Sequence, residues 1–236
     1  MLANHKVVLV VAAHPDDEVL GCGGTITRLK REGWRAVLVL MTRGITGRAE
    51  TIAAVSASQL AAQNTLSEET RKAAALIGFD SVISHDFPDN RMDTVAKADL
   101  AHVVAAVVAE EKPNLVLTHH PGDYNWDHGM TFSAVLMGAR CSPGEASPEE
   151  IWCFEIASSS ERGWSGQAPQ FKPTVYVDIE STIDVKQEAM RSYVTELRDP
   201  PHPRSIDGIA AVARRRGFEV GLQWAECFEV VRKIIR

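Results

Sequence analysis

Two polar clusters hold the residues of this sequence that are best suited to catalysis. The first is His14-Pro15-Asp16-Asp17-Glu18, and the second is the stretch 119–128, which contains three histidines and two aspartates. Two imidazoles and one carboxylate, with a fourth position left for water, are the protein ligands typical of a catalytic zinc site. We therefore expect His14, Asp17 and His128 to bind one Zn²⁺ ion. Other divalent metals could take its place, because the same ligand types accept iron, cobalt and manganese.

An apolar run precedes each cluster. Residues 7–13 are continuous, apolar and rich in β-branched side chains, as expected of a strand that is covered on both faces, and residues 115–118 also predict a strand. Ligands bind beyond the carboxyl ends of parallel strands, at the point where the winding of the sheet reverses. Both clusters can therefore face one crevice although they lie far apart in the sequence.

Strand and helix patterns alternate along the rest of the chain. Further strands are expected at 35–41, 81–84 and 175–177, and helices at 20–31, 68–77, 97–111, 183–197 and 205–216, with a polar loop at 42–58. This alternation predicts an α/β fold with a Rossmann-like, doubly wound, mostly parallel sheet and helices on both faces.

The composition fits one globular domain. The chain has 236 residues, of which 45% are hydrophobic and 24% charged, so we expect a single domain over residues 1–236. The stretch 141–173 is interrupted by proline and glycine, and we interpret it as a long surface excursion near the site. The four cysteines lie far apart without a C-x-x-C pair, which favours free, buried thiols over disulfides or a metal cluster.

Charge and hydropathy argue against several classes of partner. The 25 Lys and Arg residues against 31 Asp and Glu give a net charge of −6, which provides no general positive field for a nucleic acid. No apolar stretch approaches the ~18–20 residues that span a bilayer. Residues 1–6 are polar and lack the features of a signal peptide, so we expect a cytoplasmic protein. The glycines at 21, 23 and 24 do not complete a dinucleotide-binding loop, because Ile26 stands where G-x-G-x-x-G requires glycine.

The two clusters together resemble the PIG-L or LmbE-like family of zinc-dependent N-acetylglucosaminyl deacetylases. The resemblance rests on His14-Pro15-Asp16-Asp17-Glu18 and Asp123-x-Asn125-x-Asp127-His128, and less specifically on the stretches 87–93, 202–205 and 216–217. It implies a hydrolase that removes the acetyl group from an N-acetylglucosamine-type sugar or glycoconjugate. It also implies that His14, Asp17 and His128 hold the zinc, that Asp16 is the general base, and that the chain forms a homo-oligomer, which in some relatives is a hexamer.

The implied role of Asp16 agrees with the chemistry of amide hydrolysis. An amide is a poor electrophile and water is a poor nucleophile. Zinc lowers the pKa of bound water from 15.7 toward ~7 and polarises the acetyl carbonyl. Asp16 is adjacent to a predicted ligand without being one, so it can take the proton of the water and later deliver it to the departing amine.

One position departs from the pattern of the family. Several members have a histidine three residues before the last metal ligand, where this chain has Asn125. An asparagine can donate a hydrogen bond to an oxyanion but cannot carry a proton. Protonation of the amine then falls to Asp16 alone or to a histidine of another loop, of which His202 is our first candidate and His119 and His120 are the others. We predict Asp16, Asn125 and His202 as catalytic residues.

The arginine that some relatives use to contact the sugar falls near Leu66 here, so the sugar contacts must come from other residues. The predicted substrate-binding residues are Arg43, Asp89, Arg91, Asp123, Trp126 and Arg204. Arg204 and Arg48 could bind a phosphate or carboxylate of the substrate, although a solvated surface position is the simpler interpretation for Arg48. Asp89 and Arg91 could instead form a salt bridge within their loop.

Two other functions fit the same residues. One is an amidase on the same fold that acts on a thiol conjugate or removes a larger acyl group. The other is a non-enzymatic metal- and nucleotide-binding α/β module. In such a module a fourth protein ligand, such as Glu18 or Asp127, would close the metal site.

Overall fold

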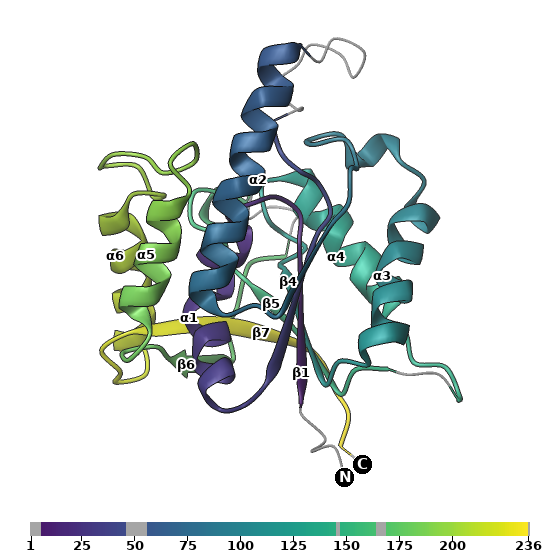
Figure 1. Ribbon diagram of the computed structural model, residues 1–236. Helices are drawn as coiled ribbons and strands as arrows, with labels where there is room; N and C mark the ends of the chain where they lie inside the picture. Colours follow the sequence, from purple (N-terminus) through teal and green to yellow (C-terminus); the bar gives the residue numbers. More distant parts are fainter. Residues whose placement is uncertain (1–5, 46–55, 145–146, 164–168, 236) are drawn as a thin grey trace.

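The computed structural model describes residues 6–45, 56–144, 147–163 and 169–235, which form one seven-stranded sheet with helices on both faces (Figure 1). The strands are β1 Val7–Ala12, β2 Arg35–Leu40, β3 Ser81–Ser84, β4 Leu115–His119, β5 Glu150–Phe154, β6 Val175–Asp178 and β7 Ala225–Lys233. The helices are α1 Asp17–Arg31, α2 Ala57–Ile77, α3 Lys97–Glu111, α4 Trp126–Gly138, α5 Ile183–Ser192 and α6 Ile206–Phe218, with short 3-10 helices η3 Met92–Thr94 and η4 Ser160–Arg162. This architecture confirms the predicted doubly wound α/β fold.

Strand β1 lies near the middle of the sheet and sends its side chains into two cores. Val8 and Val10 belong to the core that includes α1 and α5, whereas Leu9 and Val11 belong to the core that includes α3 and α4. All four side chains are fully buried. Burial of such a side chain stabilises a fold by roughly 1.5–3 kcal/mol. A strand with two covered faces needs no polar alternation, which explains its unbroken apolar run.

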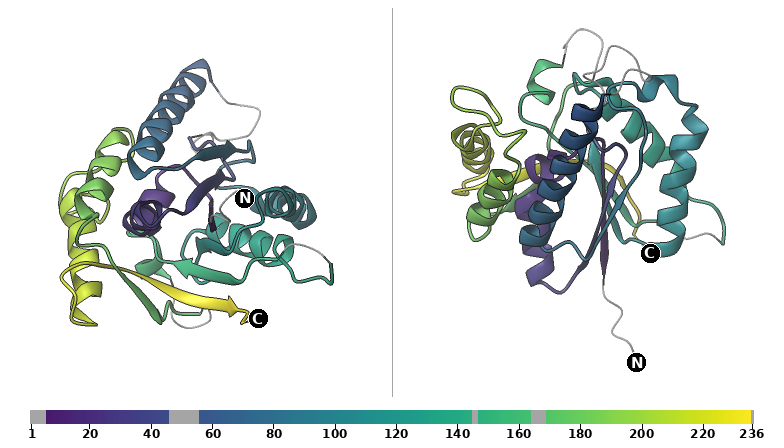
Figure 2. Two further views of the ribbon diagram at one scale, coloured as in Figure 1. Left: turned by 60° about the horizontal axis from the view of Figure 1, so that its bottom comes forward. Right: turned by 45° about the horizontal axis from the view of Figure 1, so that its top comes forward.

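The winding of the sheet reverses between β1 and β4. The strand order is β3-β2-β1-β4-β5-β7-β6, and β7 is the one antiparallel strand of those described. Helices α1, α2, α5 and α6 cover one face and α3 and α4 cover the other, as the two further views in Figure 2 also show. The loops that follow β1 and β4 therefore share the crevice where ligands bind in this class of fold.

The stretch 141–173 is not the continuous surface excursion that its composition predicts. Residues Glu150–Phe154 form β5, which pairs in parallel with β4 and antiparallel with β7. Ile151, Cys153 and Phe154 are buried in this strand. Five residues between proline- and glycine-rich segments are too few to show a clear pattern. The long final strand, β7, was not predicted either, because its mixed polar and apolar residues follow no simple alternation.

Helices α2 and α5 differ most in length from the prediction. Helix α2 begins at Ala57 rather than near residue 68, because Ser56 and Gln59 form a capping box at its start. Helix α5 ends at Ser192 rather than at residue 197. Tyr193 then turns inward and donates a hydrogen bond from Oη to Glu18 Oε1 at 2.5 Å. The segment after Tyr193 is therefore a loop, and this loop reaches the site described below.

Gly21 and Gly24 serve packing rather than nucleotide binding. A Cβ atom on Gly21 would overlap the ring of Phe154, and one on Gly24 would lie 2.9 Å from Ile179. These glycines let α1 lie close to the sheet, in agreement with the sequence argument against a dinucleotide loop.

The cysteines and the helices also bear on the sequence predictions. All four cysteines are unpaired, as expected, but Cys141 is exposed whereas the other three are buried. Within the described ranges, none of the helices has both the length and the apolar character needed to cross a bilayer.

Candidate metal and active site

The ends of β1 and β4 bring the three predicted ligands together. His14 follows β1, Asp17 is the first residue of α1, and His128 lies in the first turn of α4. His14 Nδ1 lies 3.3 Å and His128 Nε2 lies 3.4 Å from the same atom, Asp17 Oδ2. One ligand atom from each residue lies within 4.8 Å of the other two, so the three residues are placed to bind a common ion.

The second nitrogen of each imidazole faces a buried carboxylate. His14 Nε2 lies 3.2 Å from Asp127 Oδ2, and His128 Nδ1 lies 3.1 Å from Asp123 Oδ1. A carboxylate behind a ligating histidine fixes the ring orientation and makes the other nitrogen a better donor to a metal. The nitrogens left to face an ion are therefore His14 Nδ1 and His128 Nε2.

A second possible ligand group lies on the other side of His14. It consists of His14, Asp89 and Asp127, and His14 Nε2 lies 3.3 Å from Asp89 Oδ1. However, both carboxylate oxygens of Asp127 already accept backbone N–H groups, from Asn90 at 2.7 Å and from Met92 at 3.1 Å. These two bonds fix Asp127 behind His14, in the place of a carboxylate that orients a ligating imidazole.

His119 is close to the site but is not suited to bind the ion. Its Nε2 atom lies 3.4 Å from Asp17 Oδ2 and accepts the backbone N–H of Ala13 at 2.9 Å. That hydrogen bond uses the lone pair that a metal would need. Burial and the neighbouring His128 also hold the pKa of His119 well below its ordinary value, so the ring stays neutral.

Asp16 lies beside the ligand group in a strained and buried position. It precedes α1 with a left-handed backbone, φ 90°, a conformation that is costly for a residue with a Cβ and typical of functional sites. The residue is 2% exposed, and its Oδ2 accepts a hydrogen bond from Arg204 Nη1 at 3.0 Å. Burial raises the pKa of Asp16 to about 7, although the charge of Arg204 opposes this rise. Such a carboxyl group can both accept and return a proton near neutral pH.

Two adjoining cavities give access to these residues. The inner cavity, of about 130 Å³, is lined by His14, Asp16, Asp17 and Asp89 among others. The outer cavity, of about 360 Å³, is lined by His128 and by residues of the segments 124–126, 158–162 and 196–204. The residues that line both are Asn90, Asn125, Glu196 and Arg204. The outer cavity has the size of a typical small-molecule site.

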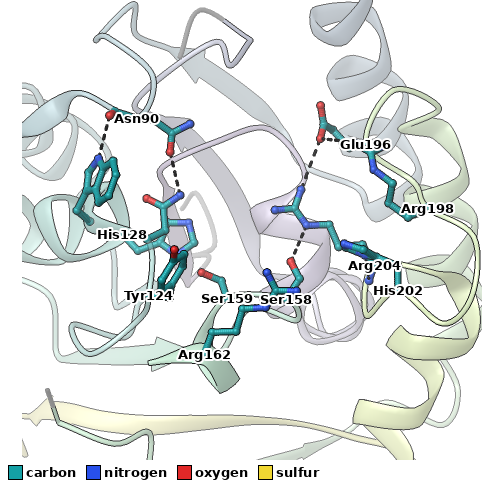
Figure 3. A pocket seen from close by; sticks show the side chains of 12 residues that line it. Asn90, Tyr124, His128, Ser158, Ser159, Arg162, Glu196, Arg198, His202 and Arg204 are labelled. Carbon is teal, nitrogen blue, oxygen red and sulfur yellow. Dashed lines mark hydrogen bonds and ion pairs between the residues drawn. The ribbon is translucent and has the colours of Figure 1, made fainter. Parts of the chain in front are cut away.

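The outer cavity has two chemically different walls (Figure 3). Asn90 and Tyr124 lie on one side, and Trp126 belongs with them because its Nε1 donates to the Asn90 carbonyl at 2.9 Å. We call these three residues the aromatic wall. Arg198, His202 and Arg204 lie on the opposite side, and Arg162 lies below, between the two sides. We call these four residues the cationic wall.

Comparison with known proteins identifies the family. The model of the PIG-L family, described as GlcNAc-PI de-N-acetylase, matches residues 9–138, which is more than half of the chain and includes both polar clusters. This chain belongs to the PIG-L family. The resemblance seen in the sequence is thereby confirmed.

The relatives of this PIG-L chain include several deacetylases. The 1D-myo-inositol 2-acetamido-2-deoxy-alpha-D-glucopyranoside deacetylase of Rhodococcus erythropolis is 28% identical over 85% of this chain and 84% of the relative. The diacetylchitobiose deacetylase of Thermococcus kodakarensis is 28% identical over 81% of this chain and 70% of the relative. The crystal structure of GalB, the 4-carboxy-2-hydroxymuconate hydratase of Pseudomonas putida KT2440, has a TM-score of 0.76 at 23% identity over 98% of both chains. Because that likeness shows only a shared fold, the reaction must be argued from the site.

Asn125, one of the predicted catalytic residues, makes structural contacts. Its Oδ1 accepts the backbone N–H of Asp127 at 2.9 Å and so caps α4, while its Nδ2 donates to Asn90 Oδ1 at 3.2 Å. Both polar ends of the side chain are therefore occupied. The geometry indicates that Asn125 holds the aromatic wall in place, next to Trp126, which is 58% exposed.

His202 lies in the cationic wall, on the far side of the outer cavity. Its Nδ1 accepts the backbone N–H of Arg204 at 3.0 Å, so a neutral ring carries its proton on Nε2. Burial lowers the pKa of His202, and so do the positive charges of Arg204, Arg198 and Arg162. The ring is therefore better suited to donate a hydrogen bond than to carry a positive charge.

Three of the predicted substrate-binding residues also make contacts inside the protein. Arg204 faces Asp16 and also donates from Nε to Ser158 Oγ at 2.9 Å, so its guanidinium is largely committed. Asp123 lies behind His128, and Ser159 and Ser160 both donate to it. Burial opposes ionisation of Asp123, but His128 and the two serines lower its pKa to about 2. Asp89 lines the inner cavity, next to His14 Nε2.

The other predicted arginines lie away from the cavities. Arg43 Nε lies 3.9 Å from Asp86 Oδ1 at an exposed position. Neither Arg43 nor Arg91 belongs to the described residues that line the two cavities. Arg48 lies outside the described residues.

Sequence analysis did not assign several residues of the site the places that they have in the structure. Asp127 had a detectable signal, because it stands immediately before the predicted ligand His128 in the second cluster. Tyr124 stands in the same cluster, but nothing in the sequence around it indicated a role in the site. Arg162 and Arg198 gave no signal, because they lie in loops without a motif and read as ordinary surface arginines.

Proposed function

We propose that this protein is a zinc-dependent hydrolase that removes the N-acetyl group from an N-acetylglucosamine-type sugar or glycoconjugate. The observation that carries the proposal is a two-histidine, one-aspartate group at the junction of two cavities, beside Asp16, a buried carboxyl group with a pKa of about 7. Membership of the PIG-L family and the activities named for its relatives support the substrate class.

The residues present fit a catalytic metal better than a structural one. His14, Asp17 and His128 offer the donor types that zinc prefers, and carboxylates orient both imidazoles. The two acids that could have closed the site as a fourth ligand are engaged elsewhere: Glu18 with Tyr193, and Asp127 with backbone N–H groups. This favours an open position, and hence an enzyme, over a module that merely binds an ion. When bound, the metal polarises the acetyl carbonyl and lowers the pKa of the attacking water.

The residues around the ligand group divide the remaining work. Asp16 takes the proton of the water and returns it to the departing amine. Arg204 holds the Asp16 carboxylate in position through its hydrogen bond of 3.0 Å. His202 donates a hydrogen bond from Nε2 to the substrate in the outer cavity, and Asn125 keeps the aromatic wall in place.

Acetate release from a panel of sugars tests the proposal. The panel contains free N-acetylglucosamine and its methyl glycoside, its 1-phosphate, chito-oligosaccharides and a thiol-linked conjugate. We expect acetate from at least one substrate with the zinc-loaded protein, and a loss of about 10²–10⁴-fold in kcat for Asp16→Asn. The zinc content of this variant should stay near one ion per chain. The exposed Asp86→Asn is the matched control.

Three outcomes would argue against this function. Full activity of Asp16→Asn would contradict the mechanism. Release of a longer acid instead of acetate would favour the amidase alternative. Absence of turnover on the whole panel would contradict deacetylation of this class of sugar.

We also propose a homo-oligomer, up to a hexamer, and a cytoplasmic location. Both rest on the sequence and on the resemblance to the family rather than on a contact between copies. Light scattering of the purified protein measures the first, and cell fractionation measures the second.

A further inference from the structure

The outer cavity concentrates positive charge on a chain that is acidic as a whole. Arg162, Arg198 and Arg204 all line it, and Glu196 is the only acidic residue among the described residues that do so. The net charge of the whole chain is −6. The surplus of arginine in this cavity is therefore a local feature and does not follow from the composition.

Arg204 is not the arginine best placed to bind a ligand, because its guanidinium group is engaged within the protein. Its Nη1 donates to Asp16 and its Nε donates to Ser158 Oγ. It lines both cavities, so the cationic wall begins beside the reacting centre and continues outward from it.

Arg198 and Arg162 have a different environment. Arg198 is held in place by Nη1, which donates to the carbonyl groups of Thr195 at 2.8 Å and Leu197 at 3.0 Å. Its side chain is still 42% exposed. Arg162 ends the short helix η4, is exposed, and has no hydrogen bond or ion pair from its side chain to the described part of the chain. Both guanidinium groups can therefore receive a ligand.

The acids nearby do not balance these charges. Glu196 is shared, since its Oε2 lies 3.5 Å from Arg204 Nη1 and 3.7 Å from Arg198 Nη2. Glu161 accepts the backbone N–H of Ser158 at 2.7 Å and does not line the cavity. Asp16 pairs with Arg204, so Glu196 is the only acid of the described cavity lining left to offset the charges of Arg198 and Arg162.

We propose that the natural substrate carries an anionic group, a phosphate or a carboxylate, on the part of the conjugate that lies beyond the acetylated sugar, and that Arg162 and Arg198 bind it. The inference rests on the proposed function, which puts the acetamide in the inner cavity and leaves the outer cavity for the rest of the molecule. Guanidinium groups bind such anions through paired hydrogen bonds. Tyr124 and Trp126, on the opposite wall, are placed to pack against the sugar ring.

Matched substrates test the proposal. Methyl N-acetylglucosaminide is the neutral substrate, N-acetylglucosamine 1-phosphate carries a phosphate, and carboxymethyl N-acetylglucosaminide carries a carboxylate at the same position. Each is assayed with the zinc-loaded wild type and with Arg162→Gln, Arg198→Gln and the double variant. Arg191→Gln is the control, because Arg191 is an exposed arginine of α5 that pairs with Glu188.

We expect the wild type to prefer one or both anionic substrates over the neutral one by about tenfold or more in kcat/KM. Each single variant should lose most of this preference, because its KM for the anionic substrates rises by a much larger factor than its KM for the neutral glycoside. The KM for the anionic substrate should also rise with salt. Whichever anionic substrate has the higher kcat/KM shows whether the site prefers a phosphate or a carboxylate. Equal kcat/KM for all three substrates, or an equal loss on all of them in the variants, would overturn the proposal.

A binding measurement separates this proposal from the proposed function. Calorimetry compares glucosamine 1-phosphate with methyl glucosaminide, neither of which has an acetyl group to lose. Tighter binding of the phosphate that is lost in the double variant supports the anion site even if no substrate is deacetylated. Equal binding of the two ligands overturns the anion site even if acetate is released.

Discussion

The inner and outer cavities of this protein are built in different ways. His14 and Asp17 line the inner cavity, and His128 lies beside them at its junction with the outer cavity. The three residues come directly after β1 or in the first turn of a helix, and buried carboxylates fix the two imidazole rings. The cationic wall of the outer cavity comes from the short helix η4 and from the loop before α6, and Arg162 and Arg198 remain exposed. The groups proposed for chemistry are thus held by the rigid edge of the sheet, whereas the groups proposed for specificity lie on loops that can vary without changing the fold.

The largest expected effect comes from Asp17, whose Oδ2 atom is the common neighbour of both proposed histidine ligands. Asp17→Asn should reduce zinc from about one ion per chain to near zero and lower kcat by about a thousandfold or more, because the metal supplies the activated water. Elemental analysis and acetate release measure the two quantities, and thermal unfolding checks that the variant is folded. A folded variant that retains zinc would contradict the assignment of Asp17 as a zinc ligand.

A smaller effect is expected from the carboxylate behind His128. Asp123→Asn should weaken zinc binding by about 10–100-fold, because it removes the charge that orients and strengthens the imidazole. Competition with a chelator measures the affinity, and activity should return in excess zinc. Unchanged affinity, or activity that zinc does not restore, would show that Asp123 acts on the substrate, as the sequence alone predicted.

Substitutions in the aromatic wall should change KM for the substrate and leave kcat almost unchanged. Trp126→Ala should raise KM about three- to tenfold through loss of the packing surface, with kcat changed by less than about twofold. Trp126→Phe keeps a ring but loses the hydrogen bond to the Asn90 carbonyl, so its KM should lie between those of the wild type and Trp126→Ala. A large fall in kcat with unchanged KM would place Trp126 with the reacting groups.

The smallest effect is expected at Arg43, which lies outside both cavities. Arg43→Gln should leave kcat, KM and thermal stability within about twofold or a few degrees of the wild type, because its contact with Asp86 is an exposed pair at 3.9 Å. Steady-state kinetics and a melting curve are sufficient measurements. A tenfold rise in KM would show that the sugar extends beyond the outer cavity.

The inner cavity was the part that the sequence could predict. The apolar run of β1 and the clusters that follow two parallel strands place His14 and His128 at one edge of any doubly wound sheet. The roles of Asp123 and Asp127 behind the two histidines could not be predicted from the sequence. These roles depend on which side chains lie next to each carboxylate in space.

The outer cavity could be predicted only in part: Asn125, Trp126, His202 and Arg204 line it, but their partners in space, and the lining residues Arg162 and Arg198, could not be inferred. Arg204 and Asp16 form their hydrogen bond across 188 positions of the sequence, and no local pattern reports such a pair. Strand β5 was hidden for a related reason, since its five residues are defined by pairing with β4 and β7 rather than by their own periodicity. Features that depend on pairing between distant parts of the chain therefore could not be predicted from local sequence patterns.

Anomalous diffraction at the zinc absorption edge, from crystals of the zinc-loaded protein, tests the central claim most directly. The account predicts one peak at about 2.0–2.2 Å from His14 Nδ1, an Asp17 carboxylate oxygen and His128 Nε2. A peak between His14 Nε2, Asp89 and Asp127, or no peak within reach of His128, would contradict it.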